Sequence, residues 1–178
     1  VWIGVDLSGN GTDDTILCKI SKKGYVEEHL IEGTLDAKYR KIADIINGSK
    51  NLIMCYCEAN GIGEPMVNEV RKLVKNRSKV LYFTTTSENK NEMVGDMQLS
   101  IAEGSVTFNE DDVELYKQMG VFTYKVNRQT RRVSYAAKEP YHDDRVMALL
   151  LAKRAKQDYP VATVSSSYSF IQSRRDRI

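Results

Sequence analysis

The stretch LIMCYCE, residues 52–58, decides the fold of this chain. Its first six residues form a continuous apolar run of strand length, which is typical of a central β-strand that is covered on both faces. The run ends in Glu58. The N-terminal stretch VWIGVDL, residues 1–7, has the same construction, because it stays apolar until it reaches Asp6. If the two strands pair in parallel, Asp6 and Glu58 become neighbours at one edge of the sheet.

The segments around these strands begin as hairpins and continue as helix–strand units. Periodicity and turn residues predict a hairpin of strands at 15–21 and 25–31, helices at 35–46, 66–74, 92–103, 111–119 and 142–157, strands at 79–84 and 105–108, and a late hairpin of strands at 121–126 and 131–137. This order predicts an α/β fold with a mixed central sheet. Its first three strands are antiparallel, the later ones parallel, and helices flank both faces.

Composition indicates one globular domain of ordinary size. Of 178 residues, 42% are hydrophobic and 28% charged, and the net charge is only +2. Basic residues gather at 71–79, 127–132 and 174–177, and each cluster suits either a polyanion or a solvated face. We expect a domain over 1–160 and a Ser-rich, basic tail over 161–178 that is mobile or used for docking.

The sequence also predicts a compartment. Cys18, Cys55 and Cys57 lack the spacing of a zinc site, so buried, reduced thiols in a reducing compartment are expected. No apolar run is long enough to cross a bilayer, and no signal peptide is recognisable, so no membrane partner is expected. The chain begins inside an apolar strand without an initiator Met, as expected of a piece of a longer protein.

A third acidic position lies at the start of the last helix, where Asp143 and Asp144 follow His142. One Asp suits a helix N-terminus as a cap. Each acid alone has such a structural explanation, but all of them stand where an apolar element meets a polar turn. Crowded carboxylates repel unless a cation neutralises them, and oxygen ligands suit Mg²⁺ or Mn²⁺. Two such ions about 3.5–4 Å apart support phosphodiester hydrolysis.

Four stretches give a more specific indication: GVDLSGNGTDDTIL (4–17), CEANGIGEPMVNEV (57–70), FTTTSENKNEMV (83–94) and YHDDRVMALLLA (141–152). In this order they resemble the nuclease domain of phage terminase large subunits, over about Val1 to Lys156. The resemblance implies a ribonuclease H-like fold of the retroviral-integrase type. It also implies a metal-dependent endonuclease that cuts concatemeric viral DNA with two Mg²⁺ or Mn²⁺ ions. No base-reading helix is recognisable, so little sequence specificity is expected.

The resemblance assigns roles to the acids. Asp6 and Glu58 fall on the first two metal-binding and catalytic acids, and the third falls on the Asp143–Asp144 pair. Asp144 is the favoured ligand, and Asp143 is able to share its task. The implied partners are double-stranded viral DNA, an N-terminal ATPase domain, the small terminase subunit and the portal, in the cytoplasm of an infected bacterium. The chain has no GxxxxGK[ST] loop, so it should not hydrolyse ATP by itself.

Other positions stay open between two interpretations. His142 either positions a water or phosphate or caps the helix, and Lys90 either contacts a phosphate or is solvated. Asp13 and Asp14 are expected to be turn residues or to support the ligands from behind. The turn at 60–63 either lets the backbone approach DNA or is purely structural. Further DNA contacts are predicted at Arg128, Arg131 and Arg132.

Three rival functions follow from the same residues. A Holliday-junction resolvase would share the fold and the acids. An ATP-binding domain of the actin and sugar-kinase type would use a turn resembling SGNGTDD, residues 8–14, but the chain lacks the second such subdomain. A non-catalytic module that docks on DNA or the portal would carry the acids as structural residues.

Overall fold

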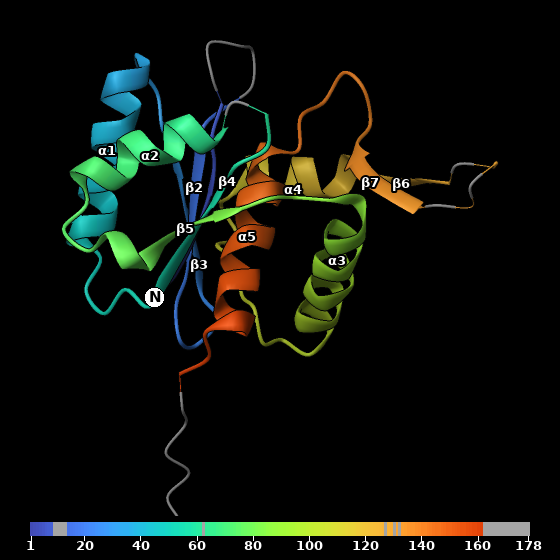
Figure 1. Cartoon of the computed structure of the whole chain (residues 1–178). Coiled ribbons are helices and arrows are strands. Elements are labelled where there is room, and N and C mark those ends of the chain that lie inside the picture. Colours follow the sequence, from blue (N-terminus) through green and yellow to red (C-terminus); the bar gives the residue numbers. More distant parts are fainter. Residues whose placement is uncertain (9–13, 62, 127, 130, 132, 162–178) are drawn as a thin grey trace, which may run out of the picture.

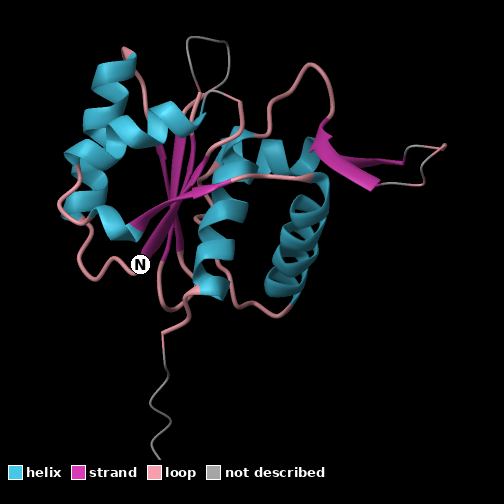
Figure 2. Cartoon of the chain, viewed as in Figure 1, coloured by secondary structure: helices cyan, strands magenta, loops and turns pink. Residues whose placement is uncertain are grey.

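A five-stranded sheet forms the centre of the molecule (Figures 1 and 2). The computed structural model describes residues 1–8, 14–61, 63–126, 128, 129, 131 and 133–161. The strands are β1 (Trp2–Asp6), β2 (Ile16–Ile20), β3 (Val26–Leu30), β4 (Met54–Glu58) and β5 (Val80–Phe83), in the order β3-β2-β1-β4-β5. β1, β2 and β3 pair antiparallel, whereas β1, β4 and β5 pair parallel. The predicted mixed sheet is confirmed.

Helices cover both faces of this sheet, as predicted (Figure 1). One face carries α1 (Leu35–Gly48) and α2 (Gly63–Leu73), and their apolar sides share a core with the sheet. The other face carries α5 (Asp144–Asp158), with α3 (Ser87–Ala102) and α4 (Val113–Val121) packed beside it. All the apolar residues of β1, β2 and β4 are therefore buried, which explains their continuous apolar runs.

Helix α5 lies directly on the central strand because β1 carries Gly4. A Cβ at that position would lie only 2.1 Å from the carbonyl oxygen of Ala148, so only glycine allows the two backbones to approach this closely. The close approach brings the N-terminus of α5 to the edge of the sheet where β1 ends.

Several predicted boundaries need correction. Helix α3 begins at Ser87 and not at Glu92, because Thr86 and Asn89 form a capping box that starts it earlier. The expected strand at 105–108 is reduced to one β-bridge between Tyr25 and Thr107. Helix α5 begins at Asp144, two residues after the expected start. Helix α2 starts three residues earlier than expected, at Gly63.

The predicted late hairpin exists as a separate two-stranded sheet of β6 (Phe122–Val126) and β7 (Val133–Ala137). It projects from the body beside α3 (Figure 2). Phe122 stacks on Tyr135 at its base, with the ring centroids 6.0 Å apart, and the Asn91 amide of α3 donates a hydrogen bond to the Val133 carbonyl. The rest of β6 is exposed.

The three cysteines are buried and free, as predicted. In the part of the chain that the structure describes, no helix is long and apolar enough to span a membrane. Most of the expected tail, from 162 to 178, lies outside the described residues.

Candidate active site

Two acidic side chains meet where the parallel strands β1 and β4 end. The register pairs Val5 with Cys57, so Asp6 and Glu58 follow side by side, as the sequence predicts. Burial is the largest cause that raises the pKa of Asp6 well above its ordinary value. The negative charges of Glu58, Asp144 and Asp143 and a hydrogen bond shared with Glu58 raise this pKa further. The four acids therefore form one electrostatic cluster.

The N-terminus of α5 supplies the other two acids. Asp144 is only 9% exposed, and its Oδ2 accepts a hydrogen bond of 2.9 Å from the backbone N–H of Asp14. The Asp14 backbone thus holds the Asp144 carboxylate in place, which is one of the two roles expected for Asp14. The next residue, Arg145, anchors the helix through an ion pair of 2.8 Å with Glu28, whose side chain is 3% exposed. Burial raises the pKa of Glu28 to about 7 even though Arg145 opposes the shift.

Asp143 stands at the N-cap position of α5, but its side chain makes no capping hydrogen bond, so the capping alternative does not apply to it. Its Oδ2 instead accepts a hydrogen bond of 3.0 Å from Nζ of Lys90 on α3. Lys90 is 17% exposed and lies 5.4 Å from the ring centroid of Phe122. The alternative of a solvated Lys90 is therefore also wrong.

An open cleft of about 370 Å³ lies over the cluster. Its carboxylates come from Asp6, Glu58 and Asp143, and Lys90 adds a positive charge. The remaining lining residues come from the segments after β4 and β5, from β7 and from α5: Asn60, Thr85, Thr86, Ser87, Ser134, Tyr135 and Met147. The cleft thus joins segments that are far apart in the sequence.

Thr85 is a cleft residue that sequence reasoning missed. Its backbone N–H donates to Oδ1 of Asn60 at 3.0 Å, and its carbonyl accepts from Nδ2 of the same side chain at 2.9 Å. These two hydrogen bonds fix the segment after β5 against the turn after β4. The Thr85 Oγ1 is buried and has no hydrogen-bond partner among the described residues. The run of three threonines before a helix start was the available signal.

Gly61 and Gly63, in the turn after β4, have structural roles. A Cβ on Gly63 would lie 2.6 Å from the carbonyl oxygen of Glu58, so glycine lets α2 start directly behind this acid. Gly61 has a φ of 61°, in the region that favours glycine.

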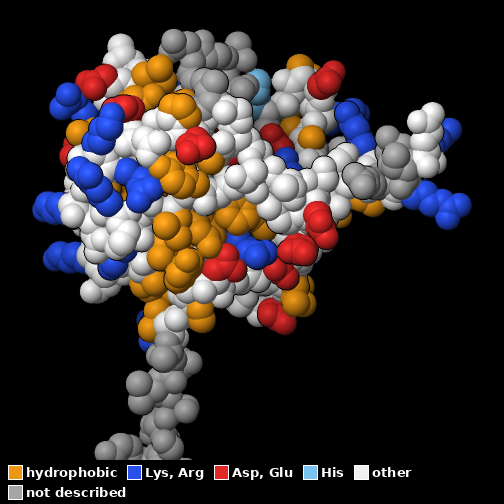
Figure 3. All heavy atoms as spheres, in the orientation of Figure 1, with side chains coloured by type: hydrophobic (Ala, Val, Ile, Leu, Met, Phe, Trp, Pro, Cys, Tyr) orange, Lys and Arg blue, Asp and Glu red, His pale blue; other side chains and the backbone are white. Residues whose placement is uncertain are grey.

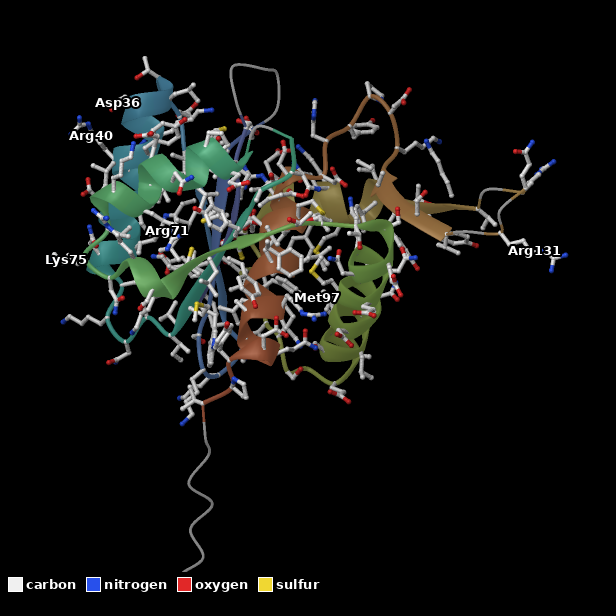
Figure 4. All side chains as sticks on the ribbon, in the orientation of Figure 1. Asp36, Arg40, Arg71, Lys75, Met97 and Arg131 are labelled. Carbon is white, nitrogen blue, oxygen red and sulfur yellow. The ribbon has the colours of Figure 1, made fainter. Side chains whose placement is uncertain are left out.

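The other predicted residues lie elsewhere. His142 is exposed and lines a separate depression beside α4 with Tyr116, Pro140 and other residues, so it does not border the acidic cleft. Arg128 and Arg131 are exposed in the turn between β6 and β7, and Figure 4 places Arg131 at the tip of that hairpin. Asp13 and Arg132 lie outside the described residues.

The donor set fits a hard divalent cation by its chemistry. All four acids offer oxygen ligands, and a cation would relieve the repulsion that raises the pKa of Asp6. Among the described residues, however, no three acidic, histidine or cysteine side chains converge closely enough to hold one ion.

The mixed sheet of order β3-β2-β1-β4-β5, with helices on both faces, is a ribonuclease H-like fold, as predicted. The large terminase nuclease from thermophilic phage G20c has this fold with a TM-score of 0.69 at 18% identity, covering 89% of this chain and 81% of that one. Its structure with bound magnesium gives 0.68 at 19% identity, over 86% and 79%.

The large terminase nuclease domain of Thermus phage P74-26 gives a TM-score of 0.68 at 16% identity, covering 91% of this chain and 80% of that one. No protein-family model matches the sequence, and no curated protein matches it either. At these identities the likeness shows the fold. The chain has the ribonuclease H-like fold of phage large terminase nuclease domains.

Proposed function

We propose that this chain is the endonuclease domain of a viral DNA-packaging terminase large subunit. It cuts concatemeric double-stranded viral DNA by metal-dependent hydrolysis. The observation that carries the proposal is the cluster of four acids where β1 and β4 end and α5 begins, in a fold that matches such nucleases over most of the chain. Buried, mutually repelling carboxylates cost stability, and such sites are characteristic of function.

Two divalent ions, Mg²⁺ or Mn²⁺, belong to this proposal. The solved structures of the G20c nuclease with magnesium and with cobalt support the choice of divalent metals. Asp6, Glu58 and Asp144 would hold them, with Asp143 sharing the task. Bound there, the ions would polarise the phosphate and lower the pKa of an attacking water.

The other cleft residues bind and orient the DNA. The Lys90 ammonium reduces the repulsion among the acids, and it can move from Asp143 to a phosphate oxygen of the substrate. The Thr85 hydroxyl, which has no partner among the described residues, donates a hydrogen bond to the same phosphate group. Asn60 keeps Thr85 in place.

Contacts outside the cleft set the specificity and the partners. Arg128 and Arg131, with Arg132 beside them in the sequence, contact the DNA backbone from the hairpin, and phosphate contacts carry no base information. We therefore propose little sequence preference. In the full-length protein the domain acts with an ATPase domain, the small terminase subunit and the portal, in the host cytoplasm.

The test is cleavage of supercoiled plasmid with Mg²⁺, with Mn²⁺ or with a chelator. We expect nicked and linear DNA and then a smear with either metal, and intact plasmid with chelator. Cutting should weaken as salt rises, because Lys and Arg contacts release counterions. Discrete fragments from one short sequence would contradict the low specificity, and cutting in chelator would contradict the metal requirement.

Further assays on the same purified protein distinguish the proposed nuclease from the three rival functions. Symmetric cutting of four-way junctions in preference to linear duplex would favour a resolvase. Binding of Mn²⁺ measured by calorimetry separates the nuclease from a docking module, which should not bind the ion. Binding of ATP would favour the kinase-like alternative.

Thr85→Val should lower kcat/KM about 10- to 100-fold, the usual effect of losing one hydrogen bond to a charged group. Valine keeps the shape of the side chain and leaves the backbone bonds to Asn60 intact, so stability should hardly change. Thr85→Ser should restore most of the activity. Thr84→Val is the matched control, because Thr84 is exposed and does not line the cleft. Equal losses in Thr84→Val and Thr85→Val would remove the hydroxyl from the mechanism.

A further inference from the structure

A strongly basic surface lies away from the acidic cleft, on α2 and on the 3-10 helix η1 (Arg77–Lys79). The segment from 63 to 80 contains five basic and two acidic side chains, a net charge of +3, although the whole chain carries only +2. Figure 3 shows Lys and Arg side chains gathered over α1 and α2, and Asp and Glu over α3. We call the residues Arg71, Lys72, Lys75 and Arg77 the α2 basic surface.

These side chains are available for a partner. Lys75 and Arg77 are exposed, and neither has an acidic partner in the part of the chain that the structure describes. Lys72 forms an exposed pair with Glu69, and such pairs are weak. The Arg71 guanidinium is held over the Tyr82 ring, 5.1 Å from its centroid, and so keeps its position. Figure 4 shows Arg71 and Lys75 on the same side of the molecule.

The surface is also concave. Arg71, Lys72 and Arg77 line a depression of about 630 Å³, together with Pro65, Asn68 and Glu69. Asn68 adds a polar group and bonds the Tyr82 hydroxyl. Several cations around one open depression suit the phosphates of a nucleic-acid backbone.

The α2 basic surface is connected to the acidic cleft by helix α2. Helix α2 starts at Gly63, packed against the carbonyl of Glu58, and runs away from the acids. At about 1.5 Å per residue, Arg71 lies about 12 Å along the helix. A duplex rises about 3.4 Å per base pair, so this distance corresponds to about four base pairs. The hairpin that carries Arg128 and Arg131 lies on the other side of the central sheet from α2 (Figure 1).

We propose that the α2 basic surface binds the phosphate backbone of the same duplex that enters the cleft, about four or more base pairs from the cut. The inference rests on the proposed nuclease function and deepens it. The duplex then lies across the acids, held by the β6–β7 hairpin on one side and by α2 on the other. Such contacts set the orientation of the duplex without reading its sequence.

The test compares two double variants that each remove two charges. Lys75→Ala/Arg77→Ala changes the α2 basic surface. Lys22→Ala/Lys23→Ala changes the exposed turn between β2 and β3, at the opposite end of the sheet from the acids. Fluorescence anisotropy measures the binding of a labelled 30-base-pair duplex in chelator, from 20 to 200 mM salt. Melting temperatures verify that both variants fold.

The expected result is a loss of affinity in Lys75→Ala/Arg77→Ala on the order of 100-fold at 50 mM salt. Two lost phosphate contacts should also lower the slope of log K against log salt by about 1.8. The control should keep the wild-type slope. Equal behaviour of the two variants, or no wild-type binding at 20 mM salt, would overturn the inference. Unchanged binding in Lys75→Ala/Arg77→Ala would overturn it too, and would leave the surface to an acidic protein partner.

The outcome for this surface is separate from the outcome for the nuclease, because binding is measured without metal. Metal-dependent cutting together with unchanged binding in Lys75→Ala/Arg77→Ala would contradict only the inference. A chain that binds through this surface but cuts no DNA would contradict only the proposed function.

Discussion

Asp6→Asn should abolish metal-dependent cleavage, a loss on the order of 1,000-fold or more. Asp6 is the acid at the end of the central strand, and the charges of Glu58, Asp144 and Asp143 all act on it. Asparagine keeps the shape but removes the charge that an ion needs. Plasmid cleavage with Mn²⁺ measures the effect, and Glu58→Gln should behave in the same way. Wild-type rates in either variant would remove that acid from the mechanism.

The same change should raise the melting temperature at neutral pH in the absence of metal. The folded protein keeps the proton on Asp6 to a higher pH than the unfolded chain does, since the folded pKa is raised. Stability therefore falls as the pH rises from the ordinary Asp value of 3.8 toward the raised value, and it stays lower above that value. Asp6→Asn removes this loss.

Thermal melts in chelator between pH 3 and pH 8 measure this effect. The difference between Asp6→Asn and the wild type should grow with pH and vanish below about pH 4, where both states are protonated. Asp44→Asn on α1 is the control, because Asp44 is exposed and outside the cluster. A lower melting temperature for Asp6→Asn at pH 7 would contradict the expectation.

Asp144→Asn and Asp143→Asn should have unequal effects. We expect Asp144→Asn to lose almost all cleavage and Asp143→Asn to keep measurable activity. Asp144 is buried, is held by the Asp14 N–H and raises the pKa of Asp6 more than Asp143 does. Asp143 is already paired with Lys90. Rates with Mn²⁺ and calorimetric Mn²⁺ affinity give the comparison.

One observation favours the opposite order, because Asp143 borders the cleft whereas Asp144 lies behind it. We give more weight to the electrostatic effect on Asp6, since an ion between two carboxylates needs both charges close together. Complete loss in both variants would mean that the pair ligates jointly. Loss in Asp143→Asn alone would reverse the two assignments.

Asp143→Asn should also have little effect on stability through capping, because its side chain makes no capping hydrogen bond. The loss of about 0.5–2 kcal/mol that a true N-cap would give is therefore not expected. The N-terminus of α5 is held in other ways. Gln118 accepts a hydrogen bond from the backbone N–H of Arg145, and the Arg145 side chain pairs with Glu28.

The main elements and two of the acids could be predicted because their signals are local. An apolar run that ends in one carboxylate indicates a buried strand with an acid at its end, and this held for Asp6 and for Glu58. The parallel pairing of β1 with β4, which was conditional in the sequence, is confirmed by the register. The start of α3 was missed because the predicted helix followed the apolar residues, whereas Thr86 and Asn89 start it through side-chain hydrogen bonds.

The contacts of Lys90, Asp143 and Thr85 could not be predicted, because each is made with a partner that is distant in the sequence. Lys90 and Asp143 are 53 residues apart, and Asn60 is 25 residues before Thr85. A lysine near a helix start is usually solvated and an Asp before a helix is usually a cap, and the structure departs from both patterns here.

Local patterns alone indicate most of the strands and helices, the buried thiols and the acids at the ends of β1 and β4, because side-chain periodicity follows directly from backbone geometry. The set of residues that meet in the cleft is determined only by the tertiary structure. Gly4 lets α5 lie close to β1, and this approach brings Asp143 and Asp144 beside Asp6. Burial and repulsion between residues that are far apart in the chain then raise the pKa of Asp6, and neither quantity exists before the elements have packed together.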